Sequence, residues 1–250
     1  MGDNKKMKEY RIDDLQLAGL YLKQDSELFC FGIDAVLLAN YAAKFIKPSY
    51  SVIDLGCGNG IIPVLLTAKS KSDQIYGLEI NKSSVNLAKE NVDFNNLQTR
   101  VKIIEGDIRS IPQELRESQF DIALSNPPYI QNKDGAANKN ENIASAKHEV
   151  HCTLDDVIGC AARLLRNGGT FVMIHRTQRL SEILHRMQHY HIEPKELIMI
   201  YPNEEKKSNL FLLKGIKGAN SWIDVLPPIY VHDQNGNYTQ QIKEIYEFKA

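Results

Sequence analysis

A strand-like segment that ends in Asn126-Pro127-Pro128-Tyr129 carries the clearest chemical signal in the sequence. Residues 120–124 are mostly apolar and predict a buried strand. The two prolines stiffen the chain and hold the Asn126 amide in one place. The Asn126 side-chain oxygen and the Pro127 carbonyl both accept hydrogen bonds, and two fixed acceptors suit one planar NH2 group. Holding both protons aims the nitrogen lone pair, so no strong base is needed, and Tyr129 can stack on the flat body that carries the amine.

A second motif, VIDLGCGNGIIPVLL at residues 52–66, combines a strand, a glycine-rich turn and the start of a helix. Gly56, Gly58 and Gly60 let the backbone approach a ligand closely. The third glycine comes one residue too early for the dinucleotide pattern, and no Lys-Ser/Thr pair follows it as in triphosphate-binding loops. Asp54 precedes the turn, and its carboxylate suits a cation better than a pyrophosphate. S-adenosylmethionine carries an ammonium and a sulfonium, and is the cofactor that we predict.

Two further acidic residues follow predicted strands at the same edge of the sheet. Glu79 comes 19 residues after Gly60 and can accept from both hydroxyls of a ribose. Asp107 is placed to accept from the amino group of the cofactor's adenine. The predicted cofactor-binding residues in these motifs are Asp54, Gly56, Cys57, Gly58, Asn59, Gly60, Glu79, Ile80, Gly106, Asp107, Ile108 and Asn126.

Strand and helix patterns alternate along the chain, which predicts an α/β fold with a parallel, doubly wound sheet. The predicted strands are 51–55, 74–80, 101–105, 120–125 and 170–174, and the predicted helices are 33–46, 60–70, 82–95, 153–166 and 178–190. The helix at 153–166 is expected to stop at Gly168-Gly169. Segments 194–202 and 208–217 are too close for a helical crossover and predict an antiparallel hairpin.

The two ends of the chain predict smaller elements. After about ten mobile residues, two short strands are expected around a turn at residues 24–27. The last part predicts an extended stretch, an Asn-Gly turn and a closing helix. We therefore expect a tail and short hairpin packed on the core at 1–33, the main domain at 34–215, and an extension of it at 216–250.

Composition limits the possible partners. The chain has 30 basic and 31 acidic residues, so nucleic-acid binding must come from local patches. The candidates are Lys5, Lys6, Lys8, Arg11, Lys133, Lys139, Lys147, Arg176 and Arg179. Four cysteines without paired spacing predict reduced thiols in a cytoplasmic protein. No apolar run reaches membrane-spanning length, and the histidines at 185, 189 and 191 lack acidic or cysteine partners at ligand spacing, so we expect no membrane partner and no metal.

The pair DLGCGNG and NPPY resembles the class I S-adenosylmethionine-dependent N-methyltransferases that act on amino groups. This resemblance implies a Rossmann-like fold: a seven-stranded, mostly parallel sheet that ends in an antiparallel hairpin, with helices on both faces. It also implies that Asn126, Pro127, Pro128 and Tyr129 are catalytic. The motif leaves three substrates open, namely adenine N6 in RNA, adenine N6 in DNA, and the side-chain amide of glutamine in proteins.

The flanks resemble a narrower family, the tRNA1(Val) adenine-37 N6-methyltransferases. FCFGIDAVLLANYA (29–42) is similar to the segment that precedes their cofactor loop, and the likeness extends through SNPPYIQ, HEVHCTLDDVIGCAARLLRNGG and YTQQIKEIYEF. It implies a tRNA substrate, and a cofactor site lined also by Phe31, Gly32 and Asp34. The long polar segment 131–148 would be a lid over the base. Methylation of ribosomal RNA, methylation of a protein glutamine, and a non-catalytic scaffold that binds S-adenosylmethionine or RNA remain the alternatives.

Overall fold

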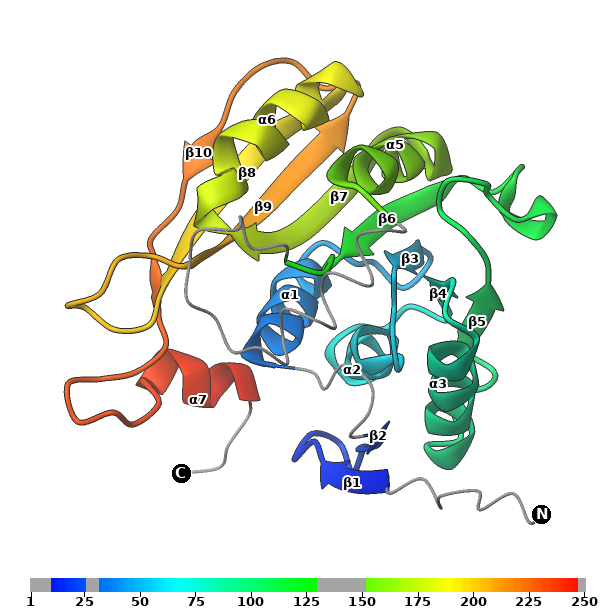
Figure 1. Cartoon of the computed structure of the whole chain (residues 1–250), viewed down its shortest axis with the longest axis horizontal. Coiled ribbons are helices and arrows are strands. Elements are labelled where there is room, and N and C mark those ends of the chain that lie inside the picture. Colours follow the sequence, from blue (N-terminus) through cyan, green and yellow to red (C-terminus); the bar gives the residue numbers. More distant parts are fainter. Residues whose placement is uncertain (1–9, 26–31, 130–151, 247–250) are drawn as a thin grey trace, which may run out of the picture.

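A mostly parallel sheet forms the centre of the protein in a computed structural model that describes residues 10–25, 32–129 and 152–246 (Figure 1). The main sheet has the order β10-β8-β9-β7-β6-β3-β4-β5, and β11 also pairs with β8. The strands are β1 (Tyr10–Asp14), β2 (Tyr21–Asp25), β3 (Ser51–Leu55), β4 (Gln74–Glu79), β5 (Val101–Glu105), β6 (Phe120–Ser125), β7 (Leu165–Arg176), β8 (Ile192–Tyr201), β9 (Leu210–Lys217), β10 (Asp224–Val225) and β11 (Ile229–Tyr230). The helices are α1 (Ile33–Ala43), α2 (Ile61–Lys69), α3 (Lys82–Phe94), α5 (Leu154–Leu164), α6 (Leu180–His189) and α7 (Gln240–Tyr246).

The predicted arrangement of the main sheet is confirmed. Strands β7, β6, β3, β4 and β5 pair in parallel, while β9 runs antiparallel between β7 and β8. These are the seven strands that the resemblance implies. The described residues add two short strands from the C-terminal part of the chain, because β10 and β11 both pair in parallel with β8. The division into segments at residues 33 and 215 stays a prediction.

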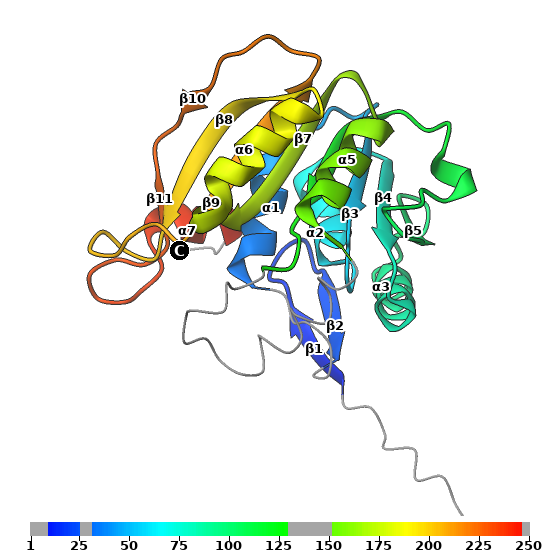
Figure 2. The ribbon, with the colours of Figure 1, turned by 45° about the horizontal axis from the view of Figure 1, so that its top comes forward.

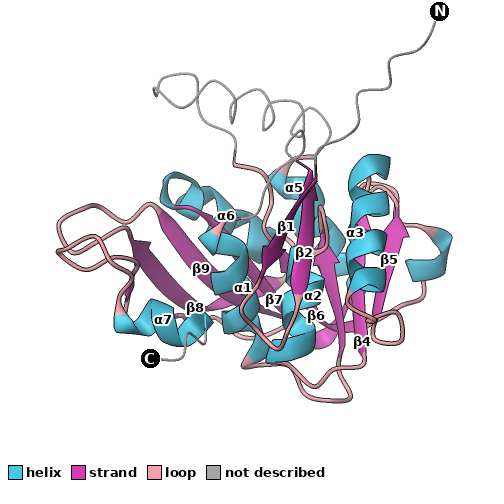
Figure 3. Cartoon of the chain, turned by 90° about the horizontal axis from the view of Figure 1, so that it is seen from below, coloured by secondary structure: helices cyan, strands magenta, loops and turns pink. Residues whose placement is uncertain are grey.

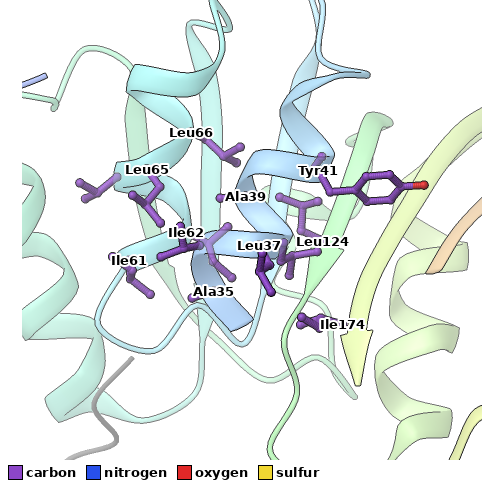
Figure 4. Close-up of a cluster of buried hydrophobic side chains, with 14 of the residues drawn as sticks. Ala35, Leu37, Ala39, Tyr41, Ile61, Ile62, Leu65, Leu66, Leu124 and Ile174 are labelled. Atoms are coloured by element: carbon purple, nitrogen blue, oxygen red, sulfur yellow. The ribbon is translucent and has the colours of Figure 1, made fainter. Parts of the chain in front are cut away.

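Helices cover both faces of the sheet and enclose two apolar cores. Successive strand residues point to opposite faces, so Val52 belongs to one core and Ile53 to the other. Helices α1, α2, α3 and α7 pack on the first face, and α5 and α6 pack on the second (Figure 2). The close-up of the first core shows side chains of α1 and α2 beside Leu124 and Ile174 of the sheet (Figure 4). The parallel strands are thus buried on both sides, which explains their almost continuous apolar sequences.

The N-terminal hairpin differs from its prediction. Strands β1 and β2 pair from Tyr10 with Asp25 to Asp14 with Tyr21, so the turn lies at residues 15–20 and not at 24–27. Gln24 and Asp25 look like turn residues but are buried in β2, and the Gln24 side chain donates to Asp13 of β1. The second predicted strand falls in residues 26–31, outside the described residues. Strand β2 lies beside α3, where Lys23 N donates to Asn91 Oδ1 at 2.7 Å (Figure 3).

The predicted end of helix 153–166 is also wrong. A Thr153 capping box starts α5 as expected, but the helix ends at Leu164 and β7 begins at Leu165. The glycine pair stands inside the strand, at an irregularity where the pairing with β6 shifts register. Gly168 has a φ of 74°, and a Cβ on Gly169 would lie 2.8 Å from the Arg166 carbonyl oxygen. These glycines therefore permit a bulge in the sheet and do not cap the helix.

Strand order reverses between β3 and β6. From β3 the chain runs outward through β4 and β5, then returns to place β6 on the other side of β3. In open α/β sheets, ligands bind beyond the carboxyl ends of the strands at such a reversal. The glycine loop follows β3 and the NPPY segment follows β6, so both predicted motifs stand at this point.

Cys57 of the glycine loop packs closely against Gly77 of β4, where there is no room for a side chain. A Cβ on Gly77 would lie 2.7 Å from Cys57 Sγ and 2.9 Å from Ile103 Cδ1. Gly215 is in a similar position elsewhere in the sheet, because a Cβ there would clash with Met187 Cε and lie 2.7 Å from Ile192 Cγ2.

We predict that Gly77→Ala lowers the free energy of unfolding by about 1–3 kcal/mol, because the core cannot take an extra methyl without shifting Cys57. It should also weaken S-adenosylmethionine binding, since the shift displaces the glycine loop. Urea unfolding and titration calorimetry measure the two effects. Gly215→Ala is the matched control: it should lower stability by a similar amount and leave cofactor binding unchanged. Equal binding by both variants would contradict the proposed role of Gly77.

Candidate active site

Asp54 is a buried carboxylate near the carboxyl end of β3. It is the last residue but one of β3, in register with Gly77 of β4 and Leu124 of β6. Only 1% of its surface is exposed, and neither side-chain oxygen has a partner among the described residues. Burial, with a smaller contribution from the charge of Glu79, raises the pKa of Asp54 to about 8. A buried ionised carboxylate is costly unless it is paired, so this group fits a cationic ligand.

The loop after Asp54 is shaped by three glycines in the left-handed region. Gly56, Gly58 and Gly60 have φ values of 79°, 55° and 83°, which other residues rarely adopt. The backbone N–H groups of Gly56 and Cys57 donate to Leu78 O at 2.8 and 3.2 Å, which fixes the loop on β4. The loop therefore needs its glycines for its conformation, and it leads directly into the N-terminus of α2.

Glu79 ties the loop to the end of β4. One carboxylate oxygen accepts from Gly58 N at 3.0 Å, and the other accepts from Asn81 N at 2.8 Å. Each oxygen keeps a further lone pair for a ligand. Glu79 and Asp54 are thus brought together beneath the glycine loop, as predicted. Ile80, which follows Glu79, is 45% exposed and offers an apolar surface at the same edge.

Cys57 and Asn59 hold the loop from inside. Both are buried, and burial is the main reason that the pKa of Cys57 lies well above its usual value. Asn59 Oδ1 accepts from Ile61 N at 3.3 Å, and its carbonyl accepts from Asn91 Nδ2 at 2.9 Å. Their side chains support the loop, which is consistent with a role for Cys57 through its backbone only.

Asp107, the predicted contact for the cofactor's adenine, forms an ion pair with an arginine. Asp107 follows β5, and its carboxylate pairs with Arg109, with the closest N–O distance at 2.6 Å. A bond from Gly106 N to Glu79 O (2.9 Å) holds this turn against β4. Ile108 is only 9% exposed and belongs to the second core. The sequence analysis missed Arg109, although its position two residues after Asp107 was an available signal.

The NPPY segment and the start of α1 meet at the Tyr129 hydroxyl. This oxygen lies 2.7 Å from Asn126 Oδ1 and 2.8 Å from Asp34 Oδ2. Asp34 is buried, and its other oxygen accepts from Ala35 N at 3.0 Å. A Cβ on Gly32 would lie 2.9 Å from Asp34 Oδ1, so a side chain there would crowd the carboxylate. Because a hydroxyl carries one proton, Asp34 and Asn126 compete for it.

The ring of Tyr129 is enclosed by two neighbours from the end of β7. The Arg176 guanidinium stands 5.0 Å from the ring centroid, and the His175 ring lies edge-on at 5.2 Å. A base cannot stack on the ring face that Arg176 covers. Burial and the adjacent Asp34 raise the pKa of the Tyr129 hydroxyl well above its usual value, so it stays protonated. The Tyr129 hydroxyl is therefore a hydrogen-bond donor.

His175 is a buried member of the site that the sequence analysis did not identify. Its Nδ1 accepts from Arg176 N at 2.8 Å, which places the proton of the neutral ring on Nε2. Burial lowers the pKa of His175 to about 4, and Nε2 has no partner among the described residues. Its position directly after the apolar run 171–174 was the signal in the sequence.

Several predictions lie outside the described residues. These are Phe31, the lid at 131–148, and six of the proposed phosphate contacts, namely Lys5, Lys6, Lys8, Lys133, Lys139 and Lys147. Of the others, Arg11 pairs with Asp13 and Arg179 pairs with Glu182. Within the described ranges there is no cluster of three or more potential metal ligands, and no helix has the length and apolar character to cross a membrane.

Comparison with known proteins agrees with this geometry. A family model described as a methyltransferase domain matches residues 46–246. A tRNA1(Val) (adenine(37)-N6)-methyltransferase of Aeromonas salmonicida is 26% identical over 211 residues, which cover 84% of this chain and 85% of the relative. A protein of the same name from Porphyromonas gingivalis is 26% identical over 227 residues and covers 86% of each chain. The resemblance found in the motifs is thereby confirmed.

Solved structures show the same fold at lower identity. A predicted O-methyltransferase from Agrobacterium tumefaciens matches with a TM-score of 0.69 at 20% identity, over 86% of this chain and 95% of that one. Methanocaldococcus jannaschii Trm5 in complex with adenosine matches with a TM-score of 0.62 at 15% identity, over 86% of this chain and 57% of that one. Since the family model covers well over half of the chain, this protein belongs to the methyltransferase-domain family.

Proposed function

We propose that this protein methylates the N6 amino group of an adenine in tRNA, at the anticodon-loop position 37, with S-adenosylmethionine as the donor. One observation carries the proposal: the buried Asp54, which has no hydrogen-bond partner among the described residues, and the Asn126 amide lie at the carboxyl ends of adjacent parallel strands. Asp54 pairs with Leu124, so Asn126 stands two residues beyond that register position. A donor on the glycine loop would therefore lie next to an acceptor of NH2 protons.

The residues of the donor site fit S-adenosylmethionine. Asp54 offers a buried carboxyl group that becomes a negative charge when a cation binds and displaces its proton, and Glu79 offers carboxylate lone pairs beside the loop. We assign the donor's cationic part to the loop near Asp54, its ribose to Glu79 and its adenine to the turn at Asp107. When bound there, the donor supplies a methyl group on a positively charged sulfur. The chain itself supplies position and charge, which are the main sources of rate in such a transfer.

The acceptor side works through two fixed oxygens. Asn126 Oδ1 and the Pro127 carbonyl would each accept one proton of the target amine, which directs the nitrogen lone pair at the methyl group. Neither Tyr129 nor His175 is a strong base, because the Tyr129 hydroxyl stays protonated and His175 has a pKa of about 4. Positioning of a neutral amine therefore accounts for the chemistry.

Asp34 keeps the Asn126 oxygen available. A carboxylate is a stronger hydrogen-bond acceptor than an amide oxygen, so the Tyr129 hydroxyl donates its one hydrogen bond to Asp34. Asn126 Oδ1 then retains its lone pairs for the target amine. Stacking of the base on Tyr129 requires access to the ring face opposite Arg176, or a movement of Arg176 away from the face that it covers.

The names of the relatives support adenine in tRNA among the possible amines. A glutamine amide of a protein and an adenine of ribosomal RNA present the same planar NH2, and a catalytically silent scaffold would bind donor or RNA only. Each alternative gives a different pattern of labelling in one assay. A cytoplasmic location accords with a tRNA substrate and stays a prediction.

We predict N6-methyladenosine in tRNA when the enzyme acts with labelled donor on bulk tRNA, ribosomal RNA and a glutamine-bearing release factor in parallel. Asn126→Ala should lower the rate by about 10²–10³-fold, as for the removal of one preorganised hydrogen-bonding group. Mass spectrometry of digested nucleosides identifies the product. Label only in the protein or only in ribosomal RNA would replace the tRNA proposal, and donor binding without label in any sample would favour a scaffold.

The pKa of Asp54 predicts a pH-dependent donor affinity. The carboxyl holds its proton below about pH 8 in the free protein and must lose it to pair with a cation. Affinity should therefore rise up to about tenfold per pH unit from pH 6 to 8 and level off above that range. Calorimetry in buffers of different ionisation enthalpy should detect one released proton per donor. A flat affinity over this range would show that Asp54 does not face the cation.

Asp54→Asn is the control for the pH dependence of donor affinity. The raised pKa of Asp54 also predicts how this substitution changes stability with pH. Between pH 4 and 8 the unfolded chain has lost the Asp54 proton and the folded chain retains it, so Asp54 makes stability fall as pH rises. The variant lacks this slope. It should bind donor weakly at every pH and be more stable than the wild type at pH 8, with the difference shrinking toward pH 5.

A double-mutant cycle tests the role of Asp34. Asp34→Asn should lower kcat about tenfold in the wild-type background, because Tyr129 then donates to Asn126. In the Tyr129→Phe background the same change should alter kcat less than about twofold, since no hydroxyl is left to redirect. Additive effects of the two substitutions would show that Asp34 acts through another contact.

A further inference from the structure

A cleft on the second face of the sheet is lined by three arginines from two separate segments. It has a volume of about 490 Å³ and lies between the connection from β5 to β6 and the C-terminal half of α5. Its lining residues are Arg109, Ser110, Ile111, Arg116, Arg163 and Leu164. None of the arginines was among the phosphate contacts expected from the sequence. We propose that this cleft binds a backbone phosphate of the RNA substrate; the inference rests on the proposed function and extends it.

Two of the three guanidinium groups have only neutral partners. Arg163 donates to Ile108 O at 3.0 Å and to Gly159 O at 3.4 Å. Arg116 donates to Ile111 O at 3.3 Å. Among the described residues, neither forms an ion pair with a carboxylate. A carbonyl fixes the direction of a guanidinium and leaves its full charge in place, so these two side chains are oriented but not neutralised.

Two of the carboxylates near the cleft have cationic partners. Asp107 pairs with Arg109 at 2.6 Å, and Glu114 of the short 3-10 helix η1 (Gln113–Leu115) pairs with Lys102 at 2.8 Å. Neither of these two carboxylates therefore pairs with Arg116 or Arg163. A guanidinium presents several N–H donors in a planar fork, which suits the oxygens of a phosphate.

Arg109 connects the cleft to the proposed active site. It lines the cleft and is bonded to Asp107, which follows β5 and is assigned to the donor's adenine. An RNA strand whose target base reaches Asn126 also has phosphates several nucleotides away. Because most of the affinity for nucleic acids comes from phosphate contacts, a cleft beside the donor site provides what a chain of net charge −1 otherwise lacks.

The test measures tRNA affinity as a function of salt for the full chain. Arg116→Gln and Arg163→Gln should each weaken tRNA binding about fivefold to tenfold and make the salt dependence less steep, by about 0.7–0.9 in the slope of log K against log salt for each phosphate that is no longer neutralised. The KM for tRNA should rise and kcat should not change. Arg166→Gln is the matched control, since Arg166 pairs with Asp121 at the start of β6, and it should leave both affinity and slope unchanged.

Arg163 also bonds to main-chain carbonyls, so its substitution could disturb α5. Arg116→Glu provides the independent variant, because Arg116 is exposed and makes one such bond. It should weaken tRNA binding more than Arg116→Gln, with an unchanged thermal unfolding midpoint. An affinity for tRNA that is the same in Arg116→Gln, Arg116→Glu and the wild type would overturn the proposal.

Two measurements separate this inference from the proposed function. Loss of tRNA affinity in the cleft variants supports the cleft even if no tRNA becomes methylated, whereas tRNA methylation with unchanged affinity refutes the cleft and leaves the function standing. Competition with inorganic phosphate distinguishes the source of the anion. A small-anion site would bind phosphate in an Arg116-dependent manner without any change in tRNA affinity, and this result would also overturn the RNA assignment.

Discussion

The parallel pairing of β3 with β6 is the constraint on which the site depends. These strands are separated along the chain by β4 and β5, and their register places Asp54 beside Leu124. Parallel strands present their carboxyl ends at one edge, so the glycine loop and the NPPY segment emerge together there. Both faces of the pair are buried under helices, which fixes the register because a slip by one residue would exchange the two apolar cores.

A buried carboxylate at this junction sets the electrostatics of the site. The fold places Asp54 where water is excluded, and the cost of burying its charge appears as a pKa of about 8. Glu79, by contrast, accepts two backbone N–H hydrogen bonds. Two carboxylates under one loop thus have different roles: Glu79 holds the loop in shape, while Asp54 remains unsatisfied and suited to a cation. If both carboxylates had only a structural role, we would expect Asp54 to accept hydrogen bonds from the loop as Glu79 does.

Local chemical signals made much of this readable from the sequence. Glycines with positive φ, an acidic residue at a strand end and two consecutive prolines each restrict the backbone by themselves, so the loop and the NPPY segment could be placed. The predicted position of the hairpin turn was wrong because Gln24 and Asp25 are buried in β2, where the Gln24 side chain donates to Asp13. The predicted end of α5 was wrong because a glycine pair can form a bulge in a strand as well as a helix cap. The Tyr129–Asp34 contact joins residues 95 positions apart, and no local pattern encodes it.

The two proposals meet at Arg109, and their meeting has a thermodynamic consequence. Its guanidinium is bonded to the carboxylate assigned to the donor's adenine while it lines the cleft assigned to an RNA phosphate. A donor amino group that bonds to Asp107 weakens the hold of that carboxylate on Arg109 and frees the arginine for phosphate. Linkage makes this effect reciprocal, so RNA in the cleft would favour donor binding by the same factor. One ion pair would thereby couple the two substrates across the end of β5.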